Sequence, residues 1–346
     1  MKVTIDKISS STLNAALTRE VSLTPWIPAE AGTVVVGRVL NEKKVYNQLE
    51  DRHGRMMTLH AGDVIAGVLG SRRALRGYAG EVPKSVEVGD VLHLLNLGGV
   101  VGHCVSSNPQ VGEPTLIEIL GAPTAGNGVA ASIQGGQVTP SATLSEAKVP
   151  VVWVAGSCMH AGKTAATCAL VRDLSAQGLK VGVAKVTGVS LRRDSLEMLD
   201  HGAVAAYTFT DAGLPSTCDG EVVDAARGCL NQLASSDVDV AIVELGDGIM
   251  GDYGVMDILA AEDLQATTAA TVFAATDPVA AWGGVSWLSQ HGVNVDVITG
   301  PATDNVAGCA AISRLTQRSA FNARSHSAEL AGVVAGQLNA ARHRAA

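Results

Sequence analysis

The sequence predicts two domains of different classes: a smaller β-rich barrel or sandwich, followed by an α/β domain with a mostly parallel sheet and helices on both faces. Three observations predict this: the length of 346 residues, short apolar stretches before residue 148, and strands alternating with helices after it. The expected ranges are 1–121 for the β-rich domain, 122–147 for a linker, 148–325 for the α/β domain and 326–346 for a C-terminal helix or tail.

Composition excludes several classes of protein. The net charge of −8 and the absence of a basic block argue against binding to nucleic acid. No apolar run reaches the roughly 18 residues that span a bilayer, and the N-terminal residues lack the apolar segment of a secretory signal. The 6 cysteines are scattered without a Cys-x-x-Cys pair, which is typical of a reduced compartment. We therefore expect a cytoplasmic protein without nucleic-acid or membrane partners.

The first part of the chain contains short apolar segments that are separated by turn residues. These segments are rich in β-branched residues, and they are Thr33–Leu40, Asp63–Leu69, Val91–Leu97 and Thr115–Leu120. Residues 122–147 are small and polar with Pro and Gly, which is typical of a linker.

From residue 149 the pattern changes to buried strands that alternate with helices. The expected strands are 149–155, 180–186, 238–244, 270–275 and 293–298, the last of which should close the sheet. The expected helices are 163–177, 221–234, 278–290 and 304–318, with Gly178 ending the first of them. Continuous apolar strands between helices predict a parallel sheet that is covered on both faces.

A glycine-rich segment joins the first of these strands to its helix. It reads Gly156-Ser-Cys-Met-His-Ala-Gly162-Lys163-Thr164. Glycines let backbone N–H groups turn inward, and the helix N-terminus adds partial positive charge, so this position suits a phosphate group. The residues expected to bind a nucleotide are Gly156, Ser157, His160, Ala161, Gly162, Lys163, Thr164 and Ala165. The alternative is a Gly-Lys-Thr tripeptide that occurs by chance in a tight turn.

Five residues separate Gly156 from Gly162, and this spacing resembles dethiobiotin synthetase and its relatives among the nitrogenase-iron-protein-like (SIMIBI) P-loop enzymes. Lys185, in Ala-Lys-Val-Thr-Gly, is similar to a lysine that contacts phosphate and the substrate carboxyl or carbamate in those enzymes. Asp194 follows Ser190-Leu-Arg-Arg and matches their metal-binding aspartate. Glu244, in Val-Glu-Leu-Gly-Asp-Gly, matches their Mg²⁺-binding glutamate. The resemblance covers about 150–300, implies a P-loop domain and a homodimer, and does not extend to the β-rich domain.

The same residues form a consistent set on chemical grounds. Mg²⁺ prefers hard oxygen ligands, and Thr164, Asp194 and Glu244 would supply them at the edge of the sheet where ligands bind. Lys163 and Lys185 would neutralise the phosphoryl group during its transfer. We therefore expect ATP and Mg²⁺ as cofactors, with Lys163, Lys185 and Glu244 as the catalytic residues.

Each residue also has a structural interpretation. Glu244 could be an acid exposed at the sheet edge, Asp194 could cap the following helix, and Lys185 could reach solvent from a strand end. Asp247 could support the metal ligands or belong to a turn. Within the loop, Cys158 could be a nucleophile and His160 could contact the substrate, although such loops tolerate many residues at these positions.

The resemblance implies a Mg-ATP-dependent ligase or synthetase, or a small-molecule kinase. In the ligase case a carboxylate or carbamate would be phosphorylated, and an amine or other nucleophile would then displace phosphate. The alternative is a GTP- or ATP-dependent switch or a cofactor-assembly NTPase of the metallochaperone type. The chain lacks an obvious Asn-Lys-x-Asp guanine motif and Cys/His clusters, which favours ATP and catalysis. A third interpretation is a nucleotide-binding module that has lost its activity.

Overall fold

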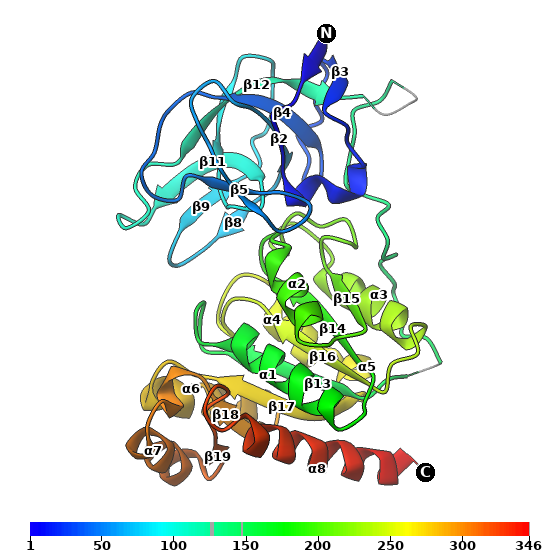
Figure 1. Cartoon of the computed structure of the whole chain (residues 1–346), viewed down its shortest axis with the longest axis vertical. Helices are drawn as coiled ribbons and strands as arrows, with labels where there is room; N and C mark the ends of the chain where they lie inside the picture. Colours follow the sequence, from blue (N-terminus) through cyan, green and yellow to red (C-terminus); the bar gives the residue numbers. More distant parts are fainter. Residues whose placement is uncertain (125–127, 147, 346) are drawn as a thin grey trace. The chain divides into compact units, whose positions relative to one another are not determined.

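The computed structural model describes residues 1–124, 128–146 and 148–345. Contacts divide the chain into two units (Figure 1). The first unit comprises Met1–Thr139, Val189–Arg193 and Phe209–Glu221, and the second comprises Pro140–Gly188, Asp194–Thr208 and Val222–Ala346. The expected linker 122–147 includes 125–127 and 147, which lie outside the described residues.

The first unit consists almost entirely of strands. In chain order its elements are β1 (Lys2–Thr4), β2 (Lys7–Ile8), the 3-10 helix η1 (Ser10–Ala15), β3 (Glu20–Thr24), β4 (Val34–Val39), β5 (Gln48–Glu50), β6 (Met56–Thr58), β7 (Val64–Leu69), β8 (Arg72–Arg73), β9 (Tyr78–Glu81), β10 (Val91–Leu94), β11 (Val100–Ser107) and β12 (Thr115–Pro123). Strands β5 and β6 form a separate two-stranded sheet, and the other strands form a ten-stranded mixed sheet.

Part of the large sheet closes into a barrel. Strand β12 pairs with β4, β4 with β7, β7 with β11, β11 with β10, and β10 again with β12. Alternate residues of these strands, such as Ile117 and Ile119, are buried in its core. Four of these strands are among the predicted segments. Strand β11 was missed because polar residues fill its second half and it follows a tight turn in which Gly99 has a φ of +100°.

Two segments from later in the chain complete the first unit. They follow β14 (Val181–Thr187) and β15 (Ala205–Thr208), respectively. They are joined to each other by the hydrogen bond from the Ser190 N–H to the Pro215 carbonyl, at 2.9 Å. The Asn14 side chain donates to the Thr210 carbonyl at 2.8 Å. The first unit is therefore not contiguous in sequence.

The second unit is an α/β fold. Besides β14 and β15 it contains β13 (Val151–Gly156), α1 (Lys163–Ala176), α2 (Arg193–Asp200), α3 (Val222–Ala234), β16 (Val240–Leu245), α4 (Val255–Ala260), α5 (Glu262–Gln265), β17 (Thr268–Ala274), α6 (Pro278–Gln290), β18 (Val297–Thr299), the 3-10 helix η2 (Pro301–Thr303), α7 (Val306–Thr316), β19 (Ser319–Ala320) and α8 (Ser327–Ala345).

The sheet of the second unit has the order β15-β14-β16-β13-β17-β18-β19, and every neighbouring pair is parallel. The prediction that the segment 293–298 closes the sheet is wrong, because β19 pairs with β18 beyond it. Strand β19 has only 2 residues, too few for a periodic pattern to reveal it.

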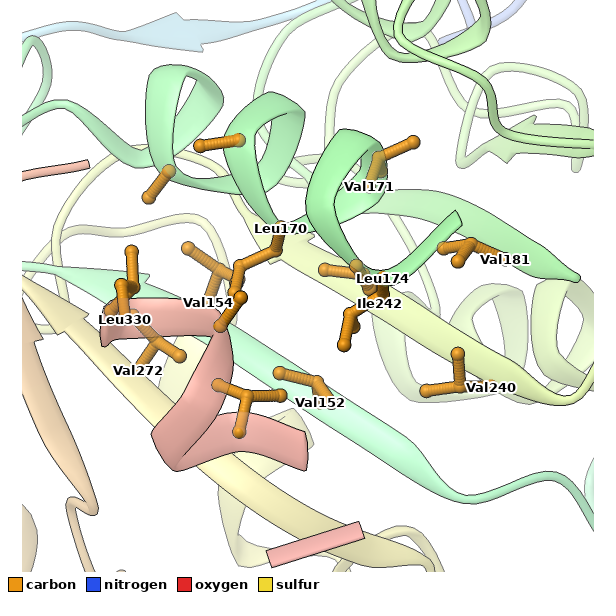
Figure 2. Close-up of a cluster of buried hydrophobic side chains, with 14 of the residues drawn as sticks. Val152, Val154, Leu170, Val171, Leu174, Val181, Val240, Ile242, Val272 and Leu330 are labelled. Carbon is orange, nitrogen blue, oxygen red and sulfur yellow. The ribbon is translucent and has the colours of Figure 1, made fainter. Parts of the chain in front are cut away.

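Helices cover both faces of this sheet. Helices α1 and α8 pack against each other on one face, where Leu170 and Leu174 of α1 point toward Val152, Val154 and Ile242 of the strands (Figure 2). Helices α3 and α6 lie on the other face, where Gly182 and Gly284 leave room for the side chains of Leu233 and Phe273, respectively. The predicted fold class, a β-rich domain followed by an α/β domain, is confirmed.

Within the described part of the chain, no helix combines the length and the apolar character that crossing a bilayer requires.

Candidate functional site

The glycine-rich loop lies between the end of β13 and the start of α1, as its sequence predicts. Gly162 precedes α1 with a φ of +93°, and His160 has a φ of +64°. Non-glycine residues are uncommon in this left-handed region, although histidine is among those that adopt it more often, and such conformations cluster in functional loops. His160 is exposed and Ala161 is fully buried, so the two neighbours have different roles in the loop.

Three glycines allow the backbone to pack closely around the loop. A Cβ atom at Gly156 would lie 3.0 Å from the Lys163 side chain, and one at Gly248 would lie 2.6 Å from the Ser157 carbonyl oxygen. Gly300, with a φ of +93°, packs against the Ala161 carbonyl group. Gly248 and Gly300 were not predicted as site residues, because the neighbour that requires a glycine at each position lies far away in the chain.

Lys163 is almost completely buried, although it carries a charged group. Its ammonium donates to the Cys158 carbonyl at 2.8 Å, within the loop itself. Burial lowers the pKa of Lys163, and the neighbouring charge of Glu244 opposes this change. Because the carbonyl group that accepts this bond is neutral, the ammonium retains the capacity to bind an anion.

Four predicted site residues meet at the carboxyl edge of the sheet. The Thr164 hydroxyl lies 3.1 Å from Glu244 Oε1, and the Lys185 ammonium lies 3.6 Å from the same oxygen. Lys185 also donates to Asp194 Oδ2. They meet because β14 and β16 are neighbours in register, with Lys185 opposite Glu244, and because Asp194 lies in the first turn of α2.

The opposite charges in this cluster determine the pKa of Lys185. Burial by itself would lower the pKa of Lys185, but the carboxylates of Asp194 and Glu244 outweigh it and raise this pKa overall. Lys185 is therefore a permanent cation between two acids. The interpretation of Lys185 as a lysine that reaches solvent is wrong, because its side chain is only 12% exposed and forms both ion pairs.

Glu244 has one carboxylate oxygen without a partner. Its side chain is 2% exposed, and Oε2 is buried without a hydrogen bond from any described residue. The interpretation of Glu244 as an exposed edge acid is therefore wrong. An unsatisfied buried carboxylate oxygen is costly and needs an explanation. A hard cation fits here, because the hydroxyl of Thr164 is close to the same carboxylate.

Two of the three proposed magnesium ligands lie together, and the third forms an ion pair with a lysine. Thr164 and Glu244 already share a contact, whereas Asp194 is paired with Lys185. Among the described residues, no group of three or more His, Cys, Asp and Glu side chains is arranged to hold a metal ion. A cation site here would therefore combine carboxylate oxygens with the Thr164 hydroxyl and water.

The remaining predicted residues lie along the loop and the first turn of α1. The Ser157 N–H donates to the Ala274 carbonyl at 2.9 Å, which ties the start of the loop to β17. Ala165 is half-buried in the first turn of α1. Asp247 is buried in the turn after β16 with a φ of +63°, so it is a turn residue that also lies close to the loop through Gly248.

No protein-family model and no curated protein sequence matches this chain. Among solved structures, it is similar to chloroplast FtsY from Physcomitrella patens, with 13% identity over 58% of this chain and 68% of that chain and a TM-score of 0.40. It is also similar to the signal recognition particle 54 kDa protein from Aeropyrum pernix in complex with GDP, with 18% identity over 61% of this chain and 52% of that chain and a TM-score of 0.37. A third similar structure is the signal recognition particle receptor FtsY from Elizabethkingia anophelis, with 14% identity over 57% of this chain and 68% of that chain and a TM-score of 0.36. These values are low, so the functional interpretation depends on the residues of this chain.

Proposed function

We propose that the second unit binds a magnesium-nucleoside triphosphate and transfers its terminal phosphoryl group. The observation that supports this most directly is the buried Glu244 carboxylate, which has an unsatisfied oxygen and lies beside the Thr164 hydroxyl at the end of a glycine-rich loop. Phosphoryl transfer depends mainly on positioning and on the stabilisation of negative charge. The cluster of Thr164, Lys185, Asp194 and Glu244 would provide both the positioning and the stabilisation of negative charge.

Each residue has a defined part in this proposal. The backbone N–H groups of the loop and the N-terminus of α1 would bind the phosphates. Lys163 would exchange its bond to the Cys158 carbonyl for a phosphate oxygen. Thr164 and Glu244, with Asp194, would hold Mg²⁺, which supplies charge neutralisation on the phosphate oxygens. Lys185 would place a permanent positive charge beside the transferred group.

For the acceptor we propose a small-molecule carboxylate, with ATP as the donor. A carboxylate oxygen would attack the terminal phosphorus, the bond to the bridging oxygen would break, and ADP would leave with that electron pair. An amine would then displace phosphate from the acyl phosphate. The buried Lys185 ammonium supports this proposal, because it is a cation that could also bind the substrate carboxylate.

A nucleotide switch is the second candidate, and a different observation favours it. Residues 189–193, which connect β14 to α2, are assigned by their contacts to the first unit and not to the second. In a switch, such a connecting segment would change its conformation with the bound nucleotide. In this case GTP would replace ATP as the preferred nucleotide.

Titration calorimetry with Mg-ATP and Mg-GTP tests the proposal. We expect the wild-type protein to bind, and Lys163→Ala to bind at least about thirtyfold more weakly, since a buried charged partner is lost. Lys180→Ala is the matched control, because Lys180 is an exposed lysine paired with Asp237 in the same unit. Binding of neither nucleotide contradicts the proposal.

The preferred nucleotide then separates the two candidates. Preference for ATP, with turnover that requires a small carboxylic acid, supports the ligase or kinase. Preference for GTP, with turnover that requires a protein partner, supports the switch.

A further inference from the structure

A pocket of about 230 Å³ lies in the second unit, beside the last strands of the sheet. Its walls come from α6, from the residues between α6 and β18, and from the end of α7 with the residues that follow it. Helices α6 and α7 contact each other near the edge of the sheet that ends with β19 (Figure 1). The pocket is therefore formed within one unit.

The pocket and the glycine-rich loop lie at opposite edges of the sheet. Val293 and Val295 come just before β18, at the edge where the parallel strands begin. Leu315 and Thr316 end α7 shortly before β19, and so they lie at the same edge. The glycine-rich loop instead follows the end of β13, which runs parallel to β17 and β18. The pocket is therefore separate from the proposed nucleotide site.

The positive charge of the pocket belongs to Arg318. Its Nη2 donates to Asn294 Oδ1 at 2.7 Å, while its Nε is buried without an acceptor among the described residues. The Asn294 amide in turn donates to Asp296 Oδ1 at 3.2 Å, so Asn294 stands between the arginine and this acid. The other Asp296 oxygen accepts from the Thr271 N–H at 2.8 Å. Because Arg318 meets a neutral amide, its guanidinium retains the capacity to bind an anion.

The end of α7 does not account for this arginine. Basic side chains often lie at a helix C-terminus, where they can donate to the last carbonyl groups. Here Gln317 has that role, because its N–H donates to the Ser313 carbonyl at 3.0 Å and its side-chain amide donates to the Arg314 carbonyl at 2.9 Å. Arg318 reaches instead to Asn294, across the pocket wall.

The rest of the pocket offers an apolar wall with an aromatic face. Trp282 of α6 and Leu315 of α7 line it and are 52% and 48% exposed, and the side chains of Val285 and Val295 line it as well. Ligand pockets typically combine such apolar walls with a few polar groups. A cavity of roughly 150 Å³ holds benzene, and pockets for drug-sized ligands begin at roughly 300 Å³. The volume of this pocket therefore suits a single ring with one small polar group.

We propose that this pocket binds a small organic acid that consists of one flat ring and a carboxylate. The carboxylate accepts hydrogen bonds from Arg318, since arginine and carboxylate form strong and directional pairs. The ring lies against the face of Trp282, where aromatic groups gain more than their buried area alone provides. This inference does not rest on the proposed function, because the pocket requires neither a nucleotide nor Mg²⁺.

Titration calorimetry of the full chain with three probes tests this inference. Benzoate has both the ring and the charge, benzamide has the ring without the charge, and acetate has the charge without the ring. The variants are Arg318→Gln, which removes the cation, and Trp282→Leu, which keeps an apolar side chain but removes the aromatic face. Arg314→Gln is the matched control, because Arg314 is an exposed arginine in the last turn of the same helix α7.

We expect the wild type to bind benzoate more tightly than either other probe. Arg318→Gln should weaken benzoate binding roughly 10- to 100-fold, as the loss of a charged hydrogen bond does. Trp282→Leu should weaken it roughly 3- to 10-fold, and Arg314→Gln should leave it unchanged. If Arg318→Gln does not fold, Trp282→Leu decides alone, because its side chain is half exposed.

Three results would overturn the inference. A wild-type protein that binds benzoate no more tightly than acetate has no site for the ring. Equal binding of benzoate and benzamide means that the charge of Arg318 is not used. Benzoate binding that is the same in the wild type, Arg318→Gln and Trp282→Leu places the probe elsewhere on the protein. None of these results bears on nucleotide binding, so the proposed function is tested separately.

Discussion

Two loops, each of which follows a strand of the parallel sheet in the chain, are held in different ways. The loop after β13, residues 157–162, is closed by close backbone contacts with Gly248 and Gly300 of the second unit. Residues 189–193, which follow β14, are held by buried side chains of the first unit, Glu50 and Asn96. Both loops lead directly into helices that carry proposed ligands, Thr164 and Asp194.

The difference shows how one site can combine a rigid part with an adjustable part. Backbone packed against backbone leaves the first loop little freedom to move. The second loop depends on a few hydrogen bonds, each of which contributes only about 1 kcal/mol to stability. We therefore expect residues 157–162 to be more rigid than residues 189–193.

The largest expected effect concerns the loop after β13, residues 157–162. Gly300→Ala combines a φ of +93° with a Cβ atom 2.8 Å from the Ala275 carbonyl oxygen and even closer to that of Ala161. Strain and overpacking together should lower the free energy of unfolding by about 3 kcal/mol. Hydrogen exchange should increase at 157–162 and stay unchanged at 189–193, as measured in one experiment. An equal increase in both loops would show that they are not held independently.

The second largest effect concerns residues 189–193. Gly98→Ala would overlap the Ser190 carbonyl group, which has to move, and overpacking of this kind costs about 2 kcal/mol. Denaturant unfolding should show the loss, and exchange should increase at 189–193 only. If exchange at 189–193 keeps its wild-type rate, the close approach of Gly98 does not hold this segment.

A smaller effect extends the comparison to the loop after β17. Asp277 caps α6 by accepting from the N–H groups of Val279 and Ala280, each at 2.9 Å. Asp277→Ala should lower the free energy of unfolding by about 1 kcal/mol at neutral pH, as measured by denaturant unfolding. Exchange at 157–162 and 189–193 should not change, since this cap is local.

This contribution should depend on pH in a defined direction. Hydrogen bonding from the Ala280 N–H lowers the pKa of Asp277 below its usual 3.8. The stabilisation is therefore complete above pH 3.8 and is lost as the pH falls through the lowered pKa. The stability difference between wild type and Asp277→Ala should shrink over that range. Asp277→Asn, which keeps an acceptor without the charge, should abolish this pH dependence.

The smallest effect calibrates the glycine variants. Gly332 is exposed in α8, and a Cβ atom there would meet nothing within 4 Å. Gly332→Ala should raise the free energy of unfolding by about 0.8 kcal/mol through helix propensity. A loss of stability here would mean that the losses at Gly98 and Gly300 cannot be ascribed to overpacking alone.

The same contrast explains what the sequence could predict. The loop after β13 could be predicted from a local pattern, since a strand, glycines and a helix follow one another within a few residues. The meeting of Lys185 with Glu244 also follows from a general rule, because parallel strands end at a common edge. Both are properties of short segments, and so are the apolar, β-branched runs between turn residues that predicted β4, β7, β10 and β12.

The remaining features depend on residues far apart in the chain. Glu50 and Asn96 lie 142 and 94 positions from their partners, and the residues around them in the sequence do not indicate which distant group each side chain will bind. The membership of residues 189–193 and 209–221 in the first unit has the same origin. Periodicity describes one element at a time, so it cannot reveal which distant segment a buried polar side chain will bind.

The interrupted composition of the first unit has a consequence for how the protein matures on the ribosome. Its last segment ends at Glu221, so the first unit is incomplete until about two thirds of the 346 residues have been synthesised. Domains usually fold in the order of their synthesis. The Glu50 carboxylate can accept its hydrogen bonds from Arg192 and Arg193 only after these residues have been synthesised. By then β13, α1 and β14 have already been made. The first unit is therefore complete only after synthesis of the second unit is well under way.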